Sequence, residues 1–379
     1  MSEEKKLILN MLKEGKITED EALKLLDAIG EKEKKEEEKT NFAEKEASFE
    51  NSVNNFVNKI LSGVETAINK AGDVINNMDF DISNINIAGS KFNANTTKTY
   101  KIEDIEEPIN FFVNNLQGAI QIQSHNQDYI ECIAIINYDN KYHDENNEFL
   151  IHKIEGNNHY FGIDLNKNNW NFKSQLIINL PKDKLNSIKV RNSNSKIQAN
   201  NFDIDNVIFE TTNARIEFSN ITSKSINATT TNAKIEAINV GADKIVTNTT
   251  NSKISLSEIK SDELEAYTTN GKINLTKLNV VDVIAQNTNG SLYVSNIFDD
   301  TNKLDLSSTN GGIYIEGLNF ERSIKASLSA RNSDVISPKF SKIYRDKHST
   351  KAYTENYDEN AENTLDITAV TTNGKISIL

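Results

Sequence analysis

The sequence predicts a mainly β protein: a parallel β-solenoid of about 19 residues per coil, preceded by a small α-helical hairpin and a long amphipathic helix. One observation behind this prediction is a repeated motif: Thr-Thr-Asn, a small residue, a basic residue and Ile. The motif stands at 211–216, 230–235, 249–254, 268–273 and 371–376. A repeat of this length cannot bury its own apolar face, so neighbouring repeats must stack into a continuous core.

A second observation is the recurrent asparagine, which returns every 19 residues from 194 to 289 and again at 310. Its parity matches that of the inward residues, so we expect an internal ladder in which the amides bond from coil to coil and to the turn backbone. The residue that follows it is always small, as a tight bend requires. The predicted structural ladder is Asn194, Asn213, Asn232, Asn251, Asn270, Asn289 and Asn310.

A third observation is that apolar residues keep fixed places around this asparagine. They stand six and four positions before it and three, five and eight positions after it, for example Ile226, Ala228, Ile235, Ala237 and Val240 around Asn232. A spacing of two puts side chains on one face of a strand. Each coil is therefore expected to have a strand before the asparagine, a strand after it and a third apolar corner.

One outward position is a candidate binding site. Two residues after the asparagine, five consecutive coils carry a cation. Two interpretations stay open: a solvated face that Glu217 and Glu236 partly neutralise, or an ordered basic stripe for an anionic envelope polymer or a lipid headgroup. The candidate ligand-binding residues are Lys196, Arg215, Lys234, Lys253 and Lys272.

The N-terminal part is predicted to be helical. Residues 1–30 form a helical hairpin, whose second helix begins with a capping box between Thr18 and Glu21. Residues 31–78 form a charged linker and then an amphipathic helix with apolar residues at steps of three and four. Its polar face is not basic, which favours packing on the β-domain or self-association over membrane contact.

The remainder is predicted to be β structure in two parts. Residues 79–190 form an irregular β region with a degenerate first coil near 111–122, and residues 191–379 form the regular solenoid. A polar insertion near 338–362 interrupts the solenoid before the last motif.

Composition and charge exclude some classes of function and indicate a cellular compartment. The formal net charge of −13 argues against nucleic-acid binding, and a single cysteine, Cys132, leaves no internal disulfide and suits a reducing compartment. The start of the sequence has no signal-peptide pattern and no apolar run is long enough to span a membrane, so the expectation is a cytoplasmic protein that acts at most peripherally at the membrane or cell envelope.

The sequence lacks the common motifs for catalysis, cofactors and metals. No phosphate-binding loop, dinucleotide fingerprint, nucleophile elbow or zinc spacing occurs, so we expect no cofactor, no metal and no enzymatic activity. The alternative is a carbohydrate-active β-helix enzyme acting on a polysaccharide. That function would require a cluster of carboxylates in a groove, whereas the sequence shows no outward column of Asp or Glu.

The stretch from Gly15 to Ile29 resembles the SHOCT-like domains found at the ends of many bacterial proteins. With the coils at 268–275 and 371–378, the whole chain resembles the bacterial putative-adhesin β-solenoid family that includes the YvlB-like and LiaX-like proteins. The resemblance implies a non-enzymatic binding or scaffold protein linked to cell-envelope stress. It also implies that the N-terminal helices dock on a partner or oligomerise. Several coils here carry Ala or Ser where the family often has Gly.

Overall fold

The computed structural model describes residues 94–103, 105, 107–115, 118–139, 150–163, 172–361 and 363–379. The chain divides into two units, residues 1–72 and 73–379, and every described residue belongs to the second unit. The predicted helical hairpin at 1–30 and the helix that was expected to end at 78 lie outside the described residues. They therefore stay predictions.

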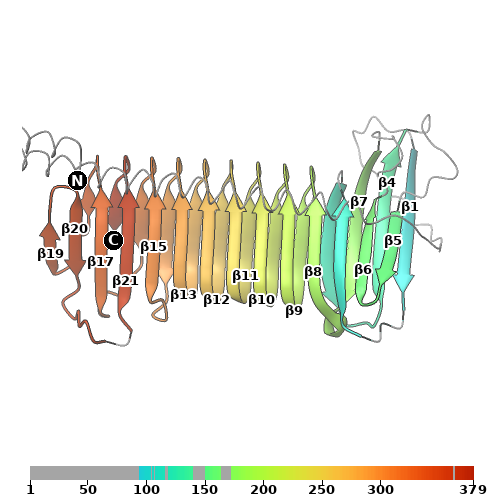
Figure 1. Ribbon diagram of the computed structural model, residues 1–379, viewed down its shortest axis with the longest axis horizontal. Helices are drawn as coiled ribbons and strands as arrows, with labels where there is room; N and C mark the ends of the chain where they lie inside the picture. Colours follow the sequence, from blue (N-terminus) through green and yellow to red (C-terminus); the bar gives the residue numbers. More distant parts are fainter. Residues whose placement is uncertain are drawn as a thin grey trace, which may run out of the picture. The chain divides into compact units, whose positions relative to one another are not determined.

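The middle of the second unit is a regular stack of parallel coils, which confirms the predicted β-solenoid (Figure 1). From residue 187 to residue 297 the paired residues stand 19 positions apart, so that Ile216 lies between Ile197 and Ile235, whereas the step to the next coil, at 303–316, is 21 residues. The strands of this array are β8 (Leu185–Asn192), β9 (Ile197–Thr211), β10 (Ile216–Thr230), β11 (Ile235–Thr249), β12 (Ile254–Thr268), β13 (Ile273–Asn287), β14 (Leu292–Ile297), β15 (Lys303–Ser308) and β16 (Ile313–Glu316).

Each long strand bends within its length, because one residue per coil adopts a left-handed backbone conformation. This residue stands seven positions after the recurrent asparagine, and its φ is 64° at Asn201 and 53° at Asn220. Asn tolerates this region better than most residues, and Gly does so without cost. The full column is Asn201, Asn220, Asn239, Glu258, Lys277, Asn296 and Gly317.

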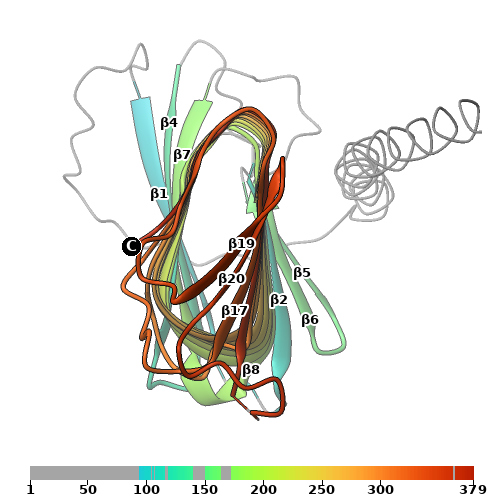
Figure 2. The ribbon, with the colours of Figure 1, turned by 90° about the vertical axis from the view of Figure 1, so that its left-hand side faces the viewer.

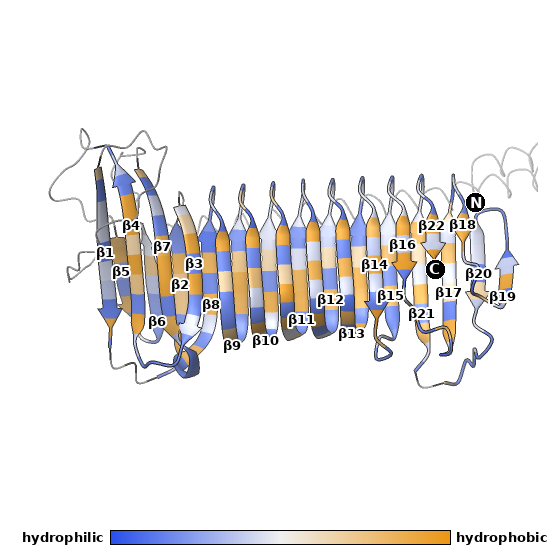
Figure 3. Ribbon diagram, turned by 180° about the vertical axis from the view of Figure 1, so that it is seen from behind, coloured by the Kyte–Doolittle hydropathy of each residue, from blue (hydrophilic) through white to orange (hydrophobic). Residues whose placement is uncertain are grey.

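The predicted apolar columns line the core, and successive coils overlie one another in the view along the stack (Figure 2). Apolar and polar bands alternate along the strands, as expected when alternate side chains point inward (Figure 3). Ile235, Leu264 and Ile313 are fully buried. Each such side chain stabilises the fold by about 1.5–3 kcal/mol.

The turn at the recurrent asparagine differs from the prediction in one respect. The asparagine side chains are exposed, not internal, because the backbone bends at this position and strand parity no longer applies. The threonine two positions earlier is the buried member. Thr268 donates to the carbonyl of Ser252 at 3.1 Å and accepts from the amide of Gly271 at 3.2 Å. This hydroxyl ties one turn to the preceding coil.

The N-terminal end is built outward from the first coil. β2 and β3 stack directly on β8 and β9, as the degenerate first coil predicts. The chain then leaves the stack to form outer strands and returns at β8. The elements of this end are β1 (Ala94–Ile102), β2 (Ile109–Asn115), β3 (Gly118–His125), β4 (Ile130–Tyr138), β5 (Leu150–Glu155), β6 (Asn158–Ile163), β7 (Phe172–Pro181) and the 3-10 helix η2 (Lys182–Lys184).

At the C-terminal end the order in space is not the order in the chain. β21 pairs with β15 on one side and with β17 on the other, so residues 365–378 form a coil between two earlier ones. A hairpin of β19 and β20 covers β17 within the predicted polar insertion. The elements of this end are β17 (Ile324–Ala330), β18 (Val335–Ile336), β19 (Lys342–Arg345), β20 (Ser349–Tyr353), β21 (Leu365–Thr371) and β22 (Ile376–Ile378).

Candidate functional site: a lysine–tyrosine patch on one face

The structure places the five predicted cations in one outward column, immediately before the strand that follows each turn. Their backbones are stacked: the carbonyl of Arg215 accepts from the amide of Ile197 at 3.0 Å, and Lys234 does the same for Ile216 at 3.1 Å. The ladder continues through Lys253 and Lys272. The column of predicted binding residues is therefore continuous along the stack.

The first three cations of this column are held by carboxylates of the neighbouring column. Lys196 and Arg215 both form ion pairs with Glu217, and Lys234 lies 2.7 Å from Glu236. Burial opposes the ionised form of Glu217, but the hydrogen bonds from Lys196 and Arg215 outweigh it and lower its pKa. Three cations thus share two carboxylates, so the predicted column is partly neutralised over its N-terminal half.

The next two lysines have no carboxylate partner among the described residues. The amide of Asn274, oriented with Oδ1 towards Lys253, accepts from its Nζ at 3.1 Å. Lys272 Nζ lies 5.9 Å from the centre of the Tyr293 ring. A cation above an aromatic face is attracted by the ring quadrupole, and its charge is not cancelled.

Two tyrosines continue this surface. The rings of Tyr293 and Tyr314 stack with their centres 4.7 Å apart and their planes at 9°. Lys375 lies with its Nζ 5.3 Å from the Tyr314 ring. A Cβ at Gly312 would come within 2.8 Å of the Tyr314 ring, so a glycine is needed for the ring to lie where it does.

We call Lys253, Lys272, Tyr293, Tyr314 and Lys375 the lysine–tyrosine patch. Two exposed apolar side chains belong to the same face near its C-terminal end: Ile336, with 42% of its surface exposed, and Leu379, with 43%. Lys375 is brought to this face by the inserted coil. The patch therefore combines unpaired cations, phenol groups and some apolar surface, a combination suited to an anionic ligand at an interface.

The opposite long face of the solenoid carries carboxylates, which a carbohydrate-active enzyme would need as a cluster in a groove. Lys244 forms ion pairs with Glu263 at 2.9 Å and with Glu265 at 2.6 Å. Tyr267 donates to Glu265 at 2.9 Å; burial and this bond raise the pKa of the phenol. Within the described residues no group of three or more His, Cys, Asp or Glu could hold a metal ion. Neither Glu263 nor Glu265 lines the polar pocket at the N-terminal end of the array.

The predicted asparagine ladder is formed from rung to rung at the exposed turn. Asn213 Nδ2 donates to Asn194 Oδ1 at 2.8 Å, and later rungs repeat this at 2.7 Å. The spatial order at the end is Asn310, Asn373 and Asn332, which follows the inserted coil. Such amide chains hold the turns in register and leave few amide groups free for a ligand.

Two features of the structure were not predicted, although the sequence contains a pattern for each of them. One is the left-handed corner column, whose first three members are asparagines at the same step of 19 as the turn asparagines. The other is the tyrosine pair, since Tyr293 and Tyr314 both stand four positions after a recurrent asparagine. No signal in the repeat indicates that the last coil is inserted between two others.

Two family models match the sequence. Residues 110–379 match the Toastrack DUF4097 family, and residues 3–34 match a SHOCT-like domain. None of the curated proteins matches the sequence significantly. Within the described part of the chain, no helix has the length and apolar character required to cross a bilayer.

Three solved structures are similar to this chain. One is described as a putative lipid binding protein from Parabacteroides distasonis (12% identity, TM-score 0.42, 76% of this chain and 98% of that chain covered). Two are described as putative adhesins, one from Parabacteroides distasonis (10% identity, TM-score 0.40, 75% and 97% covered) and one from Bacteroides fragilis (10% identity, TM-score 0.37, 76% and 98% covered). With its family match covering residues 110–379, the chain belongs to the Toastrack DUF4097 family, the putative-adhesin β-solenoid family that its coils resemble.

Proposed function

We propose that this protein is a non-enzymatic binding and scaffold protein of the cell envelope, and that its lysine–tyrosine patch binds a phosphate-bearing anionic component. One observation carries the proposal. Within a single column of stacked cations, Lys196, Arg215 and Lys234 are paired with carboxylates, whereas Lys253 and Lys272 are not. Of these two, Lys272 lies beside the exposed Tyr293, whose ring stacks on that of Tyr314.

The spacing of the patch suits a repeating anion. Parallel strands stack about 4.8 Å apart, so Lys253 and Lys272 lie about one coil apart and Lys375 stands about 14 Å beyond Lys272, three coils along the ladder. Headgroups in a lipid surface and phosphates along a polymer both present charges on this scale. Each lysine near an anionic surface contributes about 1 kcal/mol, and the net charge of −13 of the whole chain opposes this attraction over longer range.

The remaining parts of the proposal concern location and the N-terminal region. We place the protein in the cytoplasm, acting peripherally at the membrane, in a response to envelope stress. The family match at 3–34 supports a role for residues 1–78 in docking on a protein partner or in self-association. Fractionation of cells expressing the chain with and without residues 1–78 would test the location, and size-exclusion chromatography of the two forms would test self-association.

The binding proposal is tested with the full chain and two sources of glycerol phosphate. One arm uses vesicles of phosphatidylglycerol in phosphatidylcholine, and the other uses soluble poly(glycerol phosphate). We expect replacement of Lys253, Lys272 and Lys375 by Gln to weaken binding to at least one probe by tenfold or more, since about 3 kcal/mol is at stake. Binding should also weaken with added salt.

The matched control removes the same number of cations from the same column: Lys196, Arg215 and Lys234, each replaced by Gln. Because these cations are already paired, we expect a change of less than about twofold. Equal losses in the two triple variants would show that only net charge matters. A wild-type chain that binds neither probe would refute the proposal, whereas binding to one probe alone would identify the source of the phosphate.

A further inference from the structure

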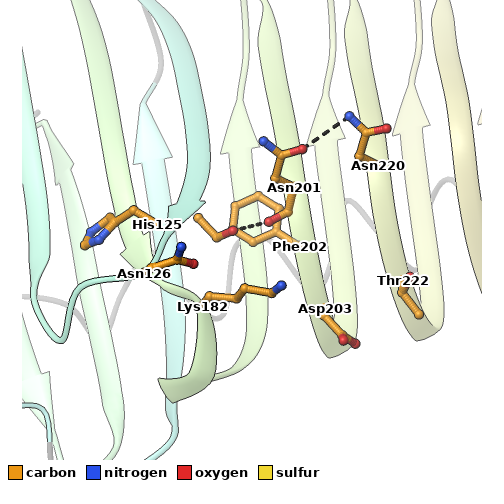
Figure 4. Close-up of a pocket in the computed structure, with 9 residues that line it drawn as sticks. His125, Asn126, Lys182, Asn201, Phe202, Asp203, Asn220 and Thr222 are labelled. Carbon is orange, nitrogen blue, oxygen red and sulfur yellow. Dashed lines mark hydrogen bonds between the residues drawn. The ribbon is translucent and has the colours of Figure 1, made fainter.

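A polar pocket lies at the N-terminal end of the regular array, at a distance along the stack from the lysine–tyrosine patch. It has a volume of about 590 Å³, within the range typical of small-molecule sites. Figure 4 shows its walls: the end of β3, the start of η2, and the corners of β9 and β10. The lining residues used below are His125, Asn126, Lys182, Asn201, Asp203 and Thr222.

The pocket exists because the first coil is incomplete. β3 pairs with β9 as far as Gln123 and Asn200, and the chain then leaves towards β4. β8 takes over as the neighbour of β9 only at Asn206. Between these points β9 has no strand on this side among the described residues, and η2 covers only part of the gap. The absence of a neighbouring strand at this corner of β9 leaves a pocket at the end of the regular stack.

The corner asparagines bring hydrogen-bond donors to this gap. Asn239 Nδ2 donates to Asn220 Oδ1 at 2.7 Å, and Asn220 Nδ2 donates to Asn201 Oδ1 at 3.2 Å. Both of these amides thus donate towards the N-terminal end, and Asn220 Nδ2 also lies 3.1 Å from Asn200 Oδ1. Asn201 is the first rung, and its own Nδ2 has no acceptor among the described residues. Hydrogen-bonded amides polarise one another, so the donor at the end of the chain is strengthened.

The other lining groups add donors and acceptors without net charge. Lys182 extends towards the β9 corner in Figure 4, and Asp203 lies at that corner; within the described structure neither side chain has an ion-pair partner. His125 Nδ1 accepts from the amide of Gln127 at 3.0 Å. Asn126 and Thr222 contribute an amide and a hydroxyl.

This lining selects a chemical class of ligand. One cation and one anion cancel, which disfavours an anion such as phosphate. The only large apolar lining residue, Phe202, is 3% exposed, so the walls offer little to an apolar ligand. Hydroxyl groups both donate and accept, and several of them on one small molecule can satisfy ammonium, carboxylate and amide groups together. We propose that this pocket binds a neutral, hydroxyl-rich sugar residue, with the Asn201 amide as a direct donor.

The test uses the full chain and two sugars, N-acetylglucosamine and glucose, in saturation-transfer NMR with inorganic phosphate as a competitor. We expect transfer to at least one sugar and no competition by phosphate. The informative variant is Asn201→Gly, because glycine keeps the left-handed backbone at φ 64° while removing the carboxamide. We expect about fivefold weaker sugar binding, the effect of one lost hydrogen bond. Asp203→Asn should also weaken it.

The matched control is Asn296→Gly, which removes the same group from the same left-handed column five coils away, outside both the pocket and the amide chain from Asn239 to Asn201. We expect unchanged sugar binding in this variant, with circular dichroism verifying that both glycine variants are folded. The proposal is overturned if the wild-type chain shows transfer to neither sugar, if both glycine variants lose binding equally, or if phosphate displaces the sugar. None of these outcomes depends on the lysine–tyrosine patch.

Discussion

The two halves of the solenoid use the same repeat but differ at two of its positions. In the N-terminal half the turn residue after the asparagine has a side chain, as at Ala214 and Ala233, and the outward cations are paired. In the C-terminal half the turn residue is glycine, as at Gly271 and Gly290, and Lys272 is unpaired; the coil between the two halves has Ser252 in the turn and an unpaired Lys253. The core columns are buried throughout, so the difference lies in turns and surface rather than in the fold.

The turns of the two halves are therefore not interchangeable. A Cβ at Gly271 would lie 1.6 Å from the carbonyl oxygen of Ser252, and one at Gly290 would lie 1.7 Å from that of Gly271. The obstacle in each case is backbone, which cannot move without separating two coils. In the other half, Thr230 donates to the carbonyl of Ala214 at 3.1 Å in a turn that accommodates a methyl group. Tight glycine turns accompany the half that carries the tyrosine pair.

The largest expected effect is on stability. Replacing Gly290 by Ala should lower the free energy of unfolding by about 3 kcal/mol, since the new methyl group forces two coils apart. Ala233→Gly is the reverse change in the other half and should cost about 1 kcal/mol or less, through backbone entropy alone. Urea denaturation followed by circular dichroism measures both. Equal losses would mean that the two kinds of turn are equivalent.

The second expected effect is a loss of folding stability at acidic pH. Near the N-terminal end, His152 and His159 lie with ring centres 5.8 Å apart, and burial together with the charge of His159 lowers the pKa of His152 to about 4. The unfolded chain binds the proton first, so stability should fall as pH drops from 6.5 towards 4 and be unaffected above this window. We expect a loss of about 2 kcal/mol, reduced from the full linkage value because the ring is partly exposed.

The variant His152→Phe should remove most of this loss. It keeps an aromatic ring near Phe161, whose centre lies 6.4 Å from that of His152, and it cannot be protonated. His348→Phe makes the same change at an exposed histidine near the other end and should leave the pH dependence unaltered. Urea denaturation at pH 7 and pH 4.5 distinguishes the two. An unchanged slope in the His152 variant would exclude this histidine as the cause.

The smallest expected effect comes from making the paired cations of the N-terminal half resemble the unpaired cations of the C-terminal half. Replacing Glu217 and Glu236 by Gln frees Lys196, Arg215 and Lys234, which should strengthen binding to phosphatidylglycerol vesicles about threefold. The stability cost should be about 0.5 kcal/mol, as for most surface ion pairs. Glu316→Gln is a suitable control, because this carboxylate forms no ion pair with a described residue. A gain in the control as large as in the double variant would point to net charge alone.

Most of the fold could be predicted because repetition averages out local ambiguity. Any one stretch such as 254–259 could be read as strand or loop, but the same apolar spacing in successive coils fixes its parity. The burial of residues in the turns, where inward and outward side chains do not alternate, was less predictable. The turn asparagine was assigned to the interior by parity, and the bend at that position puts it outside.

The candidate site was predictable only in part. The column of cations follows from spacing, but which of them is neutralised depends on side-chain rotamers in the neighbouring column. Lys375 could not be placed beside Tyr314, because the identical motif at 371–376 would fit equally well at either end of the array. Pairing between strands far apart in the chain is not encoded by the repeat itself. The pocket near Asn201 likewise depends on where the chain leaves the stack.

The inserted coil has a consequence for how the molecule is made. A growing chain can add each coil from 197 to 316 to the one before it as soon as that coil is synthesised. At residues 317–364 this vectorial order fails, because the coil that must separate β17 from β15 has not yet been translated. The outer strands can take their final neighbours only after about forty further residues have emerged. The distal end of this solenoid is therefore assembled inwards, not outwards, and the residue Lys375 that completes the patch arrives with its last interior layer.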